Sequence, residues 1–357
     1  MPGPYVAGDL PAVSVIVRSA GRPALSAALA SIAAQDYPAV DVVVVAAPGP
    51  AHPGLPDRCG AHPLRLVRSG VEEGPPGAAN AGLDAATGDW ISFLDEADVF
   101  LPGHLAGLMA ARARAPDAAV IHSFARAVLP DGRTLRFGQP HALAQLYARN
   151  CIHLSSVVFR RALAEQGCRF DPDLPVHHEW DMLLQMAQLA TFHFVLQETC
   201  QWNVGAGGHA AGDGVTEDDA VSAQCRERVH AKWASRRDAL IDRVLPMVRS
   251  AAEWAQHGDY LAAEACCHDV LALSPNDPWA LNLLASIQRD TGRGAEARAT
   301  QELAVAVRPE DPALVFNLAL LCRAQGDLER ARRCCDRAVA LDADFAPAKR
   351  LLAQLAR

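Results

Sequence analysis

The chain has 357 residues, of which 50% are hydrophobic and 21% are charged, a composition typical of folded globular proteins. Its length is sufficient for two or three domains. The formal net charge of −8 argues against a broad electrostatic surface for nucleic acid, so we expect no nucleic-acid partner.

The first ten residues contain neither the basic nor the apolar segment of an export signal. No apolar stretch approaches the roughly 20 residues that cross a bilayer, so we expect no transmembrane segment. These features predict a cytoplasmic protein, with any membrane association made through partners. The ten cysteines lack any C-x-x-C spacing, which favours small buried thiols over disulfides or metal ligands.

Strands and helices alternate over the first hundred residues. Short β-branched runs predict strands, and apolar residues at helical spacing predict helices between them. Strand, helix and strand in succession predict parallel neighbours in an open α/β sheet. The predicted strands are 13–17, 41–47, 64–67 and 90–94, and the predicted helices are 23–35 and 77–86.

The acidic cluster Asp95-Glu96-Ala97-Asp98 directly follows the fourth predicted strand. Ligands of open α/β sheets bind at the carboxyl ends of strands. Acids at that position can hold a divalent ion that neutralises a departing nucleoside diphosphate. The same four residues could equally form a solvated turn, and the cluster alone does not decide between the two interpretations.

Several segments follow the order and spacing of a family 2 glycosyltransferase with the GT-A fold, over about residues 13–202. This resemblance implies an inverting enzyme that moves a sugar from a nucleotide-sugar donor to an acceptor hydroxyl. It also implies manganese or magnesium as a cofactor. The segments that carry the resemblance are 13–23, 35–38 with the strand after it, 79–82, 88–95 and 178–181.

The resemblance assigns a role to individual residues. Glu179 is expected to be the general base, with Asp181 as a second catalytic acid. From the residues alone, Glu179 could instead be a surface acid and Asp181 an acid that stabilises a helix N-terminus. Expected on the acceptor side are His153, His178 and Trp180. Expected at the donor are Arg18, Ser19, Arg22, Asn80, Gly82 and Asp95, and expected at the metal are Asp98, Glu96 and His209.

Three positions depart from the family's usual pattern. Ala97 replaces a common metal-ligating aspartate, Ala79 replaces a common arginine, and the second strand ends in Ala46-Ala47 without an acid for the nucleobase. An alternative function is therefore a catalytically degenerate domain that serves as a binding or adaptor module in a glycosylation complex.

A glycine-rich loop at 205–214 and a helical stretch at about 216–244 follow the predicted α/β domain. The expected organisation is an α/β domain at 1–204, a connecting segment at 205–245, and a helical region at 246–357. The loop matches a G-x-G-x-x-A pattern, but no strand–helix–strand unit follows it, so it does not indicate a dinucleotide site.

The C-terminal third repeats itself with a period of 34 residues, seen in Gly258, Gly292 and Gly326. Small residues keep the same period, which predicts pairs of closely crossing helices joined at the glycines. Residues 246–345 resemble three tetratricopeptide repeats, with 346–357 as a terminal capping helix. The resemblance implies an all-α solenoid whose concave face binds a protein or peptide, although a purely structural appendage is also compatible with the sequence.

Overall fold

The computed structural model describes residues 10–47, 52, 54–70, 74–140, 143–205 and 220–355. The chain forms two compact units. The first consists of residues 1–138 and 148–232, and the second of residues 139–147 and 233–357. The long helix α7, Ala220–Gln256, therefore contributes to both units, whereas the sequence predicted that this stretch forms a separate connection.

The N-terminal half of the first unit is a parallel sheet, as predicted. Strand β1 pairs in parallel with β2 on one side and β5 on the other, and β2 pairs in parallel with β4. The elements are β1 (Val13–Ser19), α1 (Leu25–Ala33), β2 (Val40–Ala46), β3 (Arg58–Cys59), β4 (His62–Arg68), α2 (Gly74–Ala85) and β5 (Trp90–Asp95).

The remaining strands make the sheet mixed. Strand β9 runs antiparallel to both β5 and β7, while β10 runs parallel to β7. The strand order is β3-β4-β2-β1-β5-β9-β7-β10-β6, with β8 paired to β7. These further elements are β6 (Val99–Phe100), α3 (His104–Arg114), β7 (Ala118–Val128), β8 (Thr134–Phe137), η1 (Leu154–Ser156), β9 (Val157–Arg160), α5 (Ala162–Glu165), α6 (His178–Leu189) and β10 (Thr191–Asn203).

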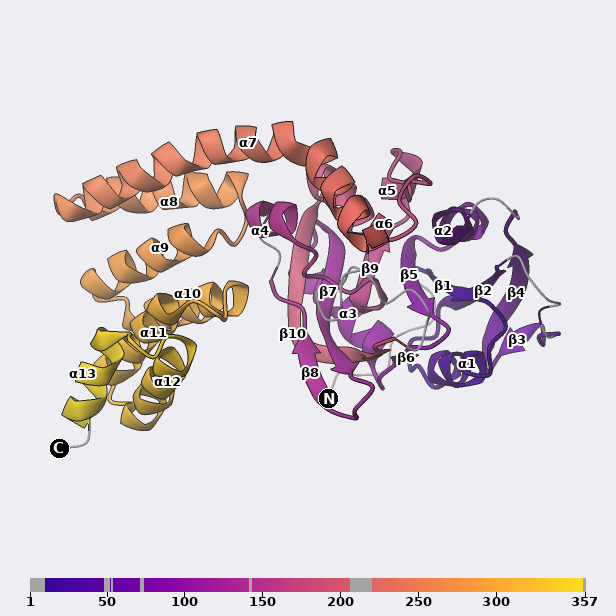
Figure 1. The fold of residues 1–357 in the computed structure, drawn as a ribbon, viewed down its shortest axis with the longest axis horizontal. Helices are drawn as coiled ribbons and strands as arrows, with labels where there is room; N and C mark the ends of the chain where they lie inside the picture. Colours follow the sequence, from indigo (N-terminus) through magenta and orange to yellow (C-terminus); the bar gives the residue numbers. More distant parts are fainter. Residues whose placement is uncertain are drawn as a thin grey trace. The chain divides into compact units, whose positions relative to one another are not determined.

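Helices α1 and α2 cover opposite faces of the parallel strands (Figure 1). Val15 and Val17 belong to the same buried cluster as Ile32 of α1. Ile16 and Val45 instead lie against Gly82 of α2. Because side chains alternate between the two faces of a strand, burial on both faces requires continuous apolar runs, which is the pattern the sequence shows.

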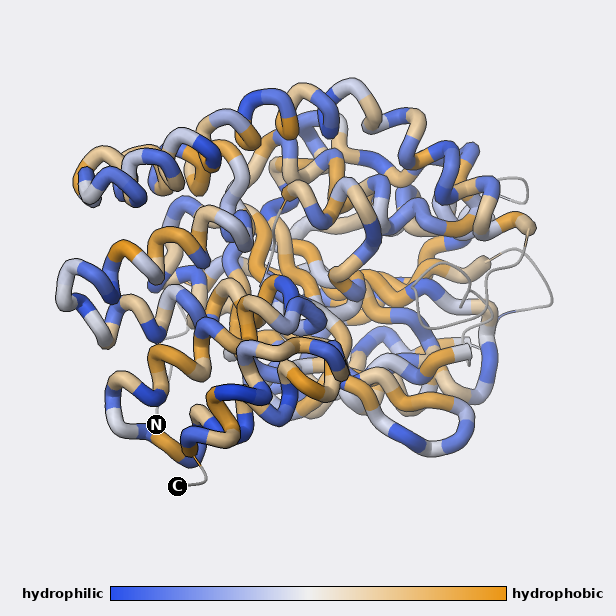
Figure 2. Tube along the Cα trace, turned by 60° about the vertical axis from the view of Figure 1, so that its left-hand side comes forward, coloured by the Kyte–Doolittle hydropathy of each residue, from blue (hydrophilic) through white to orange (hydrophobic). Residues whose placement is uncertain are grey.

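The second unit consists of paired helices. The second half of α7 precedes α8, and the pairs α9–α10 and α11–α12 follow, with α13 as the terminal helix. Their bounds, with that of the short α4, are α4 (Leu143–Ala148), α8 (Tyr260–Leu273), α9 (Pro278–Asp290), α10 (Gly294–Val307), α11 (Pro312–Ala324), α12 (Leu328–Leu341) and α13 (Ala346–Leu355). Hydrophobic and hydrophilic segments alternate along these helices, as expected for helices with one buried face (Figure 2).

The periodic residues occupy the positions that their types require. Gly258, Gly292 and Gly326 have φ values of 78°, 81° and 80°, a conformation that favours glycine, and each lies in a turn between helices. The periodic alanines at 263, 297 and 331 are completely buried, so small side chains lie where helices pack closely. The predicted α/β domain followed by an all-α region of paired helices is confirmed.

The expected end of the connecting helix needs correction. The sequence placed it near Val244, before Pro246, but α7 continues through Pro246 to Gln256. Pro278 and Pro312 each start a repeat helix, where the fixed φ and missing N–H of proline are tolerated. In the described part of the chain, no helix has both the length and the apolar character needed to span a bilayer.

Candidate functional site

Arg18 and Asp95 meet at the carboxyl ends of two neighbouring strands. Arg18 is the next-to-last residue of β1 and aligns with Asp95, the last residue of β5. The Nε of Arg18 donates to Oδ1 of Asp95 at 2.7 Å, and Nη2 donates to Oδ2 at 2.8 Å. Such a bidentate ion pair fixes the orientation of both side chains.

Glu179 approaches the same guanidinium from the first turn of α6. Nη2 of Arg18 donates to Oε1 of Glu179, and Nη1 lies 3.0 Å from Nε2 of His178. The Arg18, Asp95 and Glu179 side chains are 12%, 27% and 21% exposed, so solutes can reach the cluster. The structure thus brings together residues predicted for the donor, the acceptor side and the base.

The ion pairs control the protonation of Glu179. Burial by itself raises the pKa of this carboxyl, but the charge of Arg18, with His178 and His153, outweighs burial and lowers the pKa to about 2. Burial likewise opposes the charge on Arg18, while Asp95 and Glu179 raise the pKa of the guanidinium. Glu179 is therefore ionised, but it is a weak proton acceptor while Arg18 holds it.

Asp98 is buried in its own hydrogen-bond network. Its Oδ2 accepts from Nε2 of His153 at 3.0 Å and from the Ser155 hydroxyl at 3.2 Å, and its Oδ1 accepts from the backbone N–H of Asn203 at 3.0 Å. The His153 ring stacks on Trp202 with 4.9 Å between centroids. Burial raises the pKa of Asp98, although the bond from His153 opposes this effect.

Glu96 faces the turn after β1. Its Oε2 accepts from the Ser19 hydroxyl at 2.7 Å and from the backbone N–H groups of Ala20 and Arg22 at 3.1 and 3.2 Å. Arg22 is the exposed partner of its other oxygen, at 3.6 Å. Glu96 and Ser19 therefore hold the shape of this turn.

The expected divalent metal does not fit these carboxylates. Asp98 and Glu96 bind different partners, and both oxygens of Asp95 pair with Arg18. Among the described residues, no group of three or more histidine, cysteine, aspartate or glutamate side chains could hold a metal ion. His209, the remaining predicted ligand, lies outside the described residues.

Asn80 and Gly82, predicted at the donor, instead fix helix α2 in the fold. The Asn80 side chain donates to the carbonyl of Phe170 at 2.8 Å and accepts from its N–H at 3.0 Å. A Cβ atom at Gly82 would lie 2.4 Å from Cγ2 of Ile16. These residues are therefore not brought into the Arg18 cluster.

Asp181 and Trp180 are buried on the side of α6 that contacts α7. Asp181 has no exposed surface, and its Oδ2 accepts from Lys232 at 2.9 Å and Gln185 at 2.7 Å. Trp180 is 1% exposed and packs edge-on against His230 at 5.2 Å. Their expected contact with substrate is thus incompatible with their burial.

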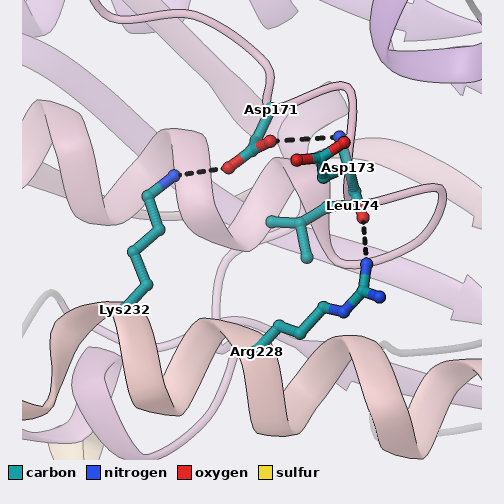
Figure 3. Close-up of a pocket in the computed structure, with 5 residues that line it drawn as sticks. All are labelled: Asp171, Asp173, Leu174, Arg228 and Lys232. Atoms are coloured by element: carbon teal, nitrogen blue, oxygen red, sulfur yellow. Dashed lines mark hydrogen bonds and ion pairs between the residues drawn. The ribbon is translucent and has the colours of Figure 1, made fainter.

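Lys232 is a residue that the sequence interpretation missed. It also donates to Asp171 at 2.7 Å, beside a cavity of about 380 Å³ (Figure 3). The remaining lining residues of the cavity are Asp173, Leu174 and Arg228. The available signal was its rarity, because Lys232 and Lys349 are the two lysines of the chain.

Comparisons with known proteins match both units. Residues 14–140 match the model of glycosyl transferase family 2, and residues 255–314 and 313–345 match two tetratricopeptide repeat models. The succinoglycan biosynthesis protein ExoO of Rhizobium meliloti is 31% identical over 173 residues, which cover 44% of this chain and 49% of that protein. The chain therefore spans about half the length of this relative.

Two further proteins are similar. The uncharacterized glycosyltransferase YwdF of Bacillus subtilis is 26% identical over 186 residues, which cover 49% of this chain and 68% of that protein. A crystal structure of a fragment of S. aureus TarS aligns with a TM-score of 0.46 at 15% identity. That alignment covers 94% of this chain and 92% of the TarS fragment.

Proposed function

The chain joins a glycosyl transferase family 2 domain to tetratricopeptide repeats, and from this premise we propose that it transfers a sugar from a nucleotide-sugar donor to an acceptor hydroxyl with inversion. The observation that carries the proposal is the convergence of Arg18, Asp95 and Glu179 at the strand ends. This edge of an open α/β sheet is where such folds bind their ligands.

In the proposed reaction, Glu179 is the general base. Its carboxylate takes the proton of the acceptor hydroxyl while the acceptor oxygen forms a bond to the anomeric carbon. The bond from that carbon to the diphosphate oxygen breaks on the opposite side, and the diphosphate leaves with the electron pair. Asp95 and Arg18 line the donor side of the site. No step of the proposed reaction is assigned to a metal ion, because among the described residues no cluster of ligands could hold one.

The test is donor hydrolysis and transfer by the full chain with a panel of nucleotide sugars. We expect hydrolysis of at least one donor, and we expect Glu179→Gln to lower turnover by about 100-fold or more. Glu165→Gln is the matched control, because Glu165 is an exposed acid on α5 that pairs with Arg161. Full turnover by Glu179→Gln would contradict the assigned base.

A specific observation also favours the alternative function, a binding or adaptor module. Four acids near the strand ends, among the residues that the structure describes, are paired within the chain: Asp95 and Glu179 with Arg18, Glu96 with the turn after β1, and Asp98 with His153. Nucleotide-sugar binding without hydrolysis or transfer to any acceptor would favour this alternative over an enzyme.

For the repeats, we propose that they bind a protein, either the acceptor or a partner enzyme. An apolar cavity of about 520 Å³ in the second unit supports this proposal. It is lined by residues of α4, α7 and α9, among them Leu245 and Trp279, which are 54% and 51% exposed. The test is the fluorescence of Trp279 during titration with candidate peptides, with Leu245→Asp expected to weaken any binding.

A further inference from the structure

Arg18 has two possible sets of partners: the carboxylates that it binds within the chain, and the diphosphate of a donor. It is the partly exposed cation between Asp95 and Glu179, and it lies at the sheet edge where the donor diphosphate is proposed to bind. Its guanidinium carbon also lies 5.9 Å from the centroid of the Phe93 ring, which adds a cation–π contact below the site. A fixed cation at this edge is a natural partner for a phosphate group.

The local charge indicates that the guanidinium of Arg18 does not pair closely with both carboxylates and a diphosphate at the same time. Asp95 and Glu179 together carry two negative charges against the single positive charge of Arg18. A diphosphate brings further negative charge, so it can pair closely with Arg18 only if one carboxylate gives way.

Glu179 is the carboxylate that can give way. Asp95 holds the guanidinium through both of its oxygens, whereas Glu179 holds it through one. Bidentate arginine–carboxylate pairs are stronger and more specific in geometry than pairs made through one oxygen. His178, whose Nε2 is 4.0 Å from Oε1 of Glu179, and the N-terminal end of α6 remain beside a displaced Glu179.

We propose that Arg18 exchanges Glu179 for the donor diphosphate, so that donor binding releases the base. This inference rests on the proposed function and adds a role in it for Arg18. The exchange breaks one ion pair and forms another, with no covalent change. The charged and titratable groups that face Glu179 are Arg18 from β1, His178 from α6 and His153 from the segment before η1.

Release has a chemical consequence for the reaction. When Arg18 turns to the diphosphate, the largest favourable charge acting on the Glu179 carboxylate is gone, and its pKa rises toward the ordinary range. A carboxylate with a higher pKa accepts the acceptor proton more readily. The base is then strong only when a donor is present, so transfer follows donor binding.

The experiment is a double-mutant cycle on nucleotide affinity. The full chain is titrated calorimetrically with UDP, GDP, ADP, CDP and dTDP in the presence of EDTA, and the tightest of these is used for all variants. Glu179→Gln removes the competitor for Arg18 and is expected to tighten binding about tenfold. Arg18→Gln is expected to weaken binding by at least as much.

The combined variant separates exchange from simple repulsion. If Arg18 is shared, Glu179→Gln tightens binding more when Arg18 is present than in the Arg18→Gln background. If Glu179 merely repels the diphosphate, the gain is equal or larger without Arg18, and that result would overturn the exchange. Arg65→Gln is the control, because Arg65 forms an ion pair with Asp41 on β2, outside the Arg18 cluster.

Two further outcomes are decisive. Binding that requires manganese and is unaffected at Arg18 would overturn the exchange and leave the proposed function standing. Failure of every folded variant to bind any nucleotide, with or without manganese, would overturn the proposed function and the exchange with it. Thermal unfolding confirms that each variant is folded, and Arg18→Lys replaces Arg18→Gln if the latter is not.

Discussion

The guanidinium of Arg18 donates to Glu179 although 161 residues separate the two in the chain. Arg18 is the next-to-last residue of β1, and Glu179 lies in the first turn of α6. This contact is one of those that join the predicted donor half to the predicted acceptor half of the domain. Through it, the charge of Arg18 lowers the pKa of Glu179.

The stability of the protein should reveal this pair through its pH dependence. The pKa of Glu179 is lowered from 4.5 to about 2 in the folded chain. A lowered carboxyl pKa adds stability above the unfolded value, and this stability is lost as the pH falls from about 4.5 toward about 2. The contribution is on the order of 3 kcal/mol at full ionisation, at about 1.4 kcal/mol per pKa unit.

The measurement is urea denaturation of wild type and Glu179→Gln at about pH 6 and about pH 3. At about pH 6 we expect wild type to have a larger free energy of unfolding than Glu179→Gln. At about pH 3 we expect this difference between the two proteins to be smaller. A difference that stays constant over this range would show that Glu179 titrates near its ordinary pKa and is not held by Arg18.

Gly82 should not tolerate a side chain. A Cβ at this position would lie 2.4 Å from Ile16 and 3.2 Å from Val45, inside the packed contact of α2 with the sheet. We expect Gly82→Ala to reduce the free energy of unfolding by about 1–3 kcal/mol. Gly107→Ala is the opposite control, because its Cβ would meet just one atom, of Gln197, at 3.8 Å.

Since Gly107 lies within helix α3, its replacement by alanine is expected to raise stability by about 0.5–1 kcal/mol. Thermal unfolding of both variants provides the comparison. Equal effects of the two substitutions on stability would refute the close packing at Gly82.

Lys232 should matter for stability rather than for the chemical step. It pairs with the fully buried Asp181, so its loss removes a cationic partner from a buried carboxylate that also accepts a hydrogen bond from Gln185. We expect Lys232→Met to cost about 1–3 kcal/mol, less than a fully buried pair because Lys232 is 39% exposed. Lys349, the other lysine, is exposed, so Lys349→Met should change the free energy of unfolding very little.

A kinetic readout accompanies this pair of variants. If Asp181 is structural, Lys232→Met lowers the melting temperature while the pH profile of turnover keeps its wild-type shape. A shifted acid limb in that profile would instead support the catalytic role that the sequence suggested for Asp181.

Much of the fold was predictable because buried strands and tight turns each require particular residue types, which can be recognised in the sequence. Strands β1 and β2 are buried on both faces, so Val42–Val45 is a continuous apolar run and Val13–Val17 is apolar except for Ser14. The turns at Gly258, Gly292 and Gly326 need a positive φ, so glycine recurs at the repeat period. Local physics fixes both features, and no distant contact is needed to infer them.

The site was less predictable because its contacts depend on distant residues. Family resemblance suggested Glu96 as a metal ligand, but the backbone N–H groups of Ala20 and Arg22 bind this carboxylate. Asp181 forms an ion pair with Lys232 of α7, and Trp180 packs against the same helix. Nothing in the short segment 178–181 indicates which of its side chains faces α7 and which faces Arg18.

The repeats allow one comparison between equivalent positions. Asp259 and Arg293 are 34 residues apart, and each precedes the second helix of a repeat. Asp259 accepts from the N–H of Ala262 at 3.1 Å and so caps α8, whereas Arg293 provides no such bond to α10 and pairs with Glu264 instead. Asp259→Ala is expected to cost about 1 kcal/mol. Arg293→Ala should cost less, because exposed ion pairs contribute little. Urea denaturation followed by circular dichroism compares the two, and an equal or larger loss at Arg293 would show that the ion pair stabilises the repeats more than the cap does.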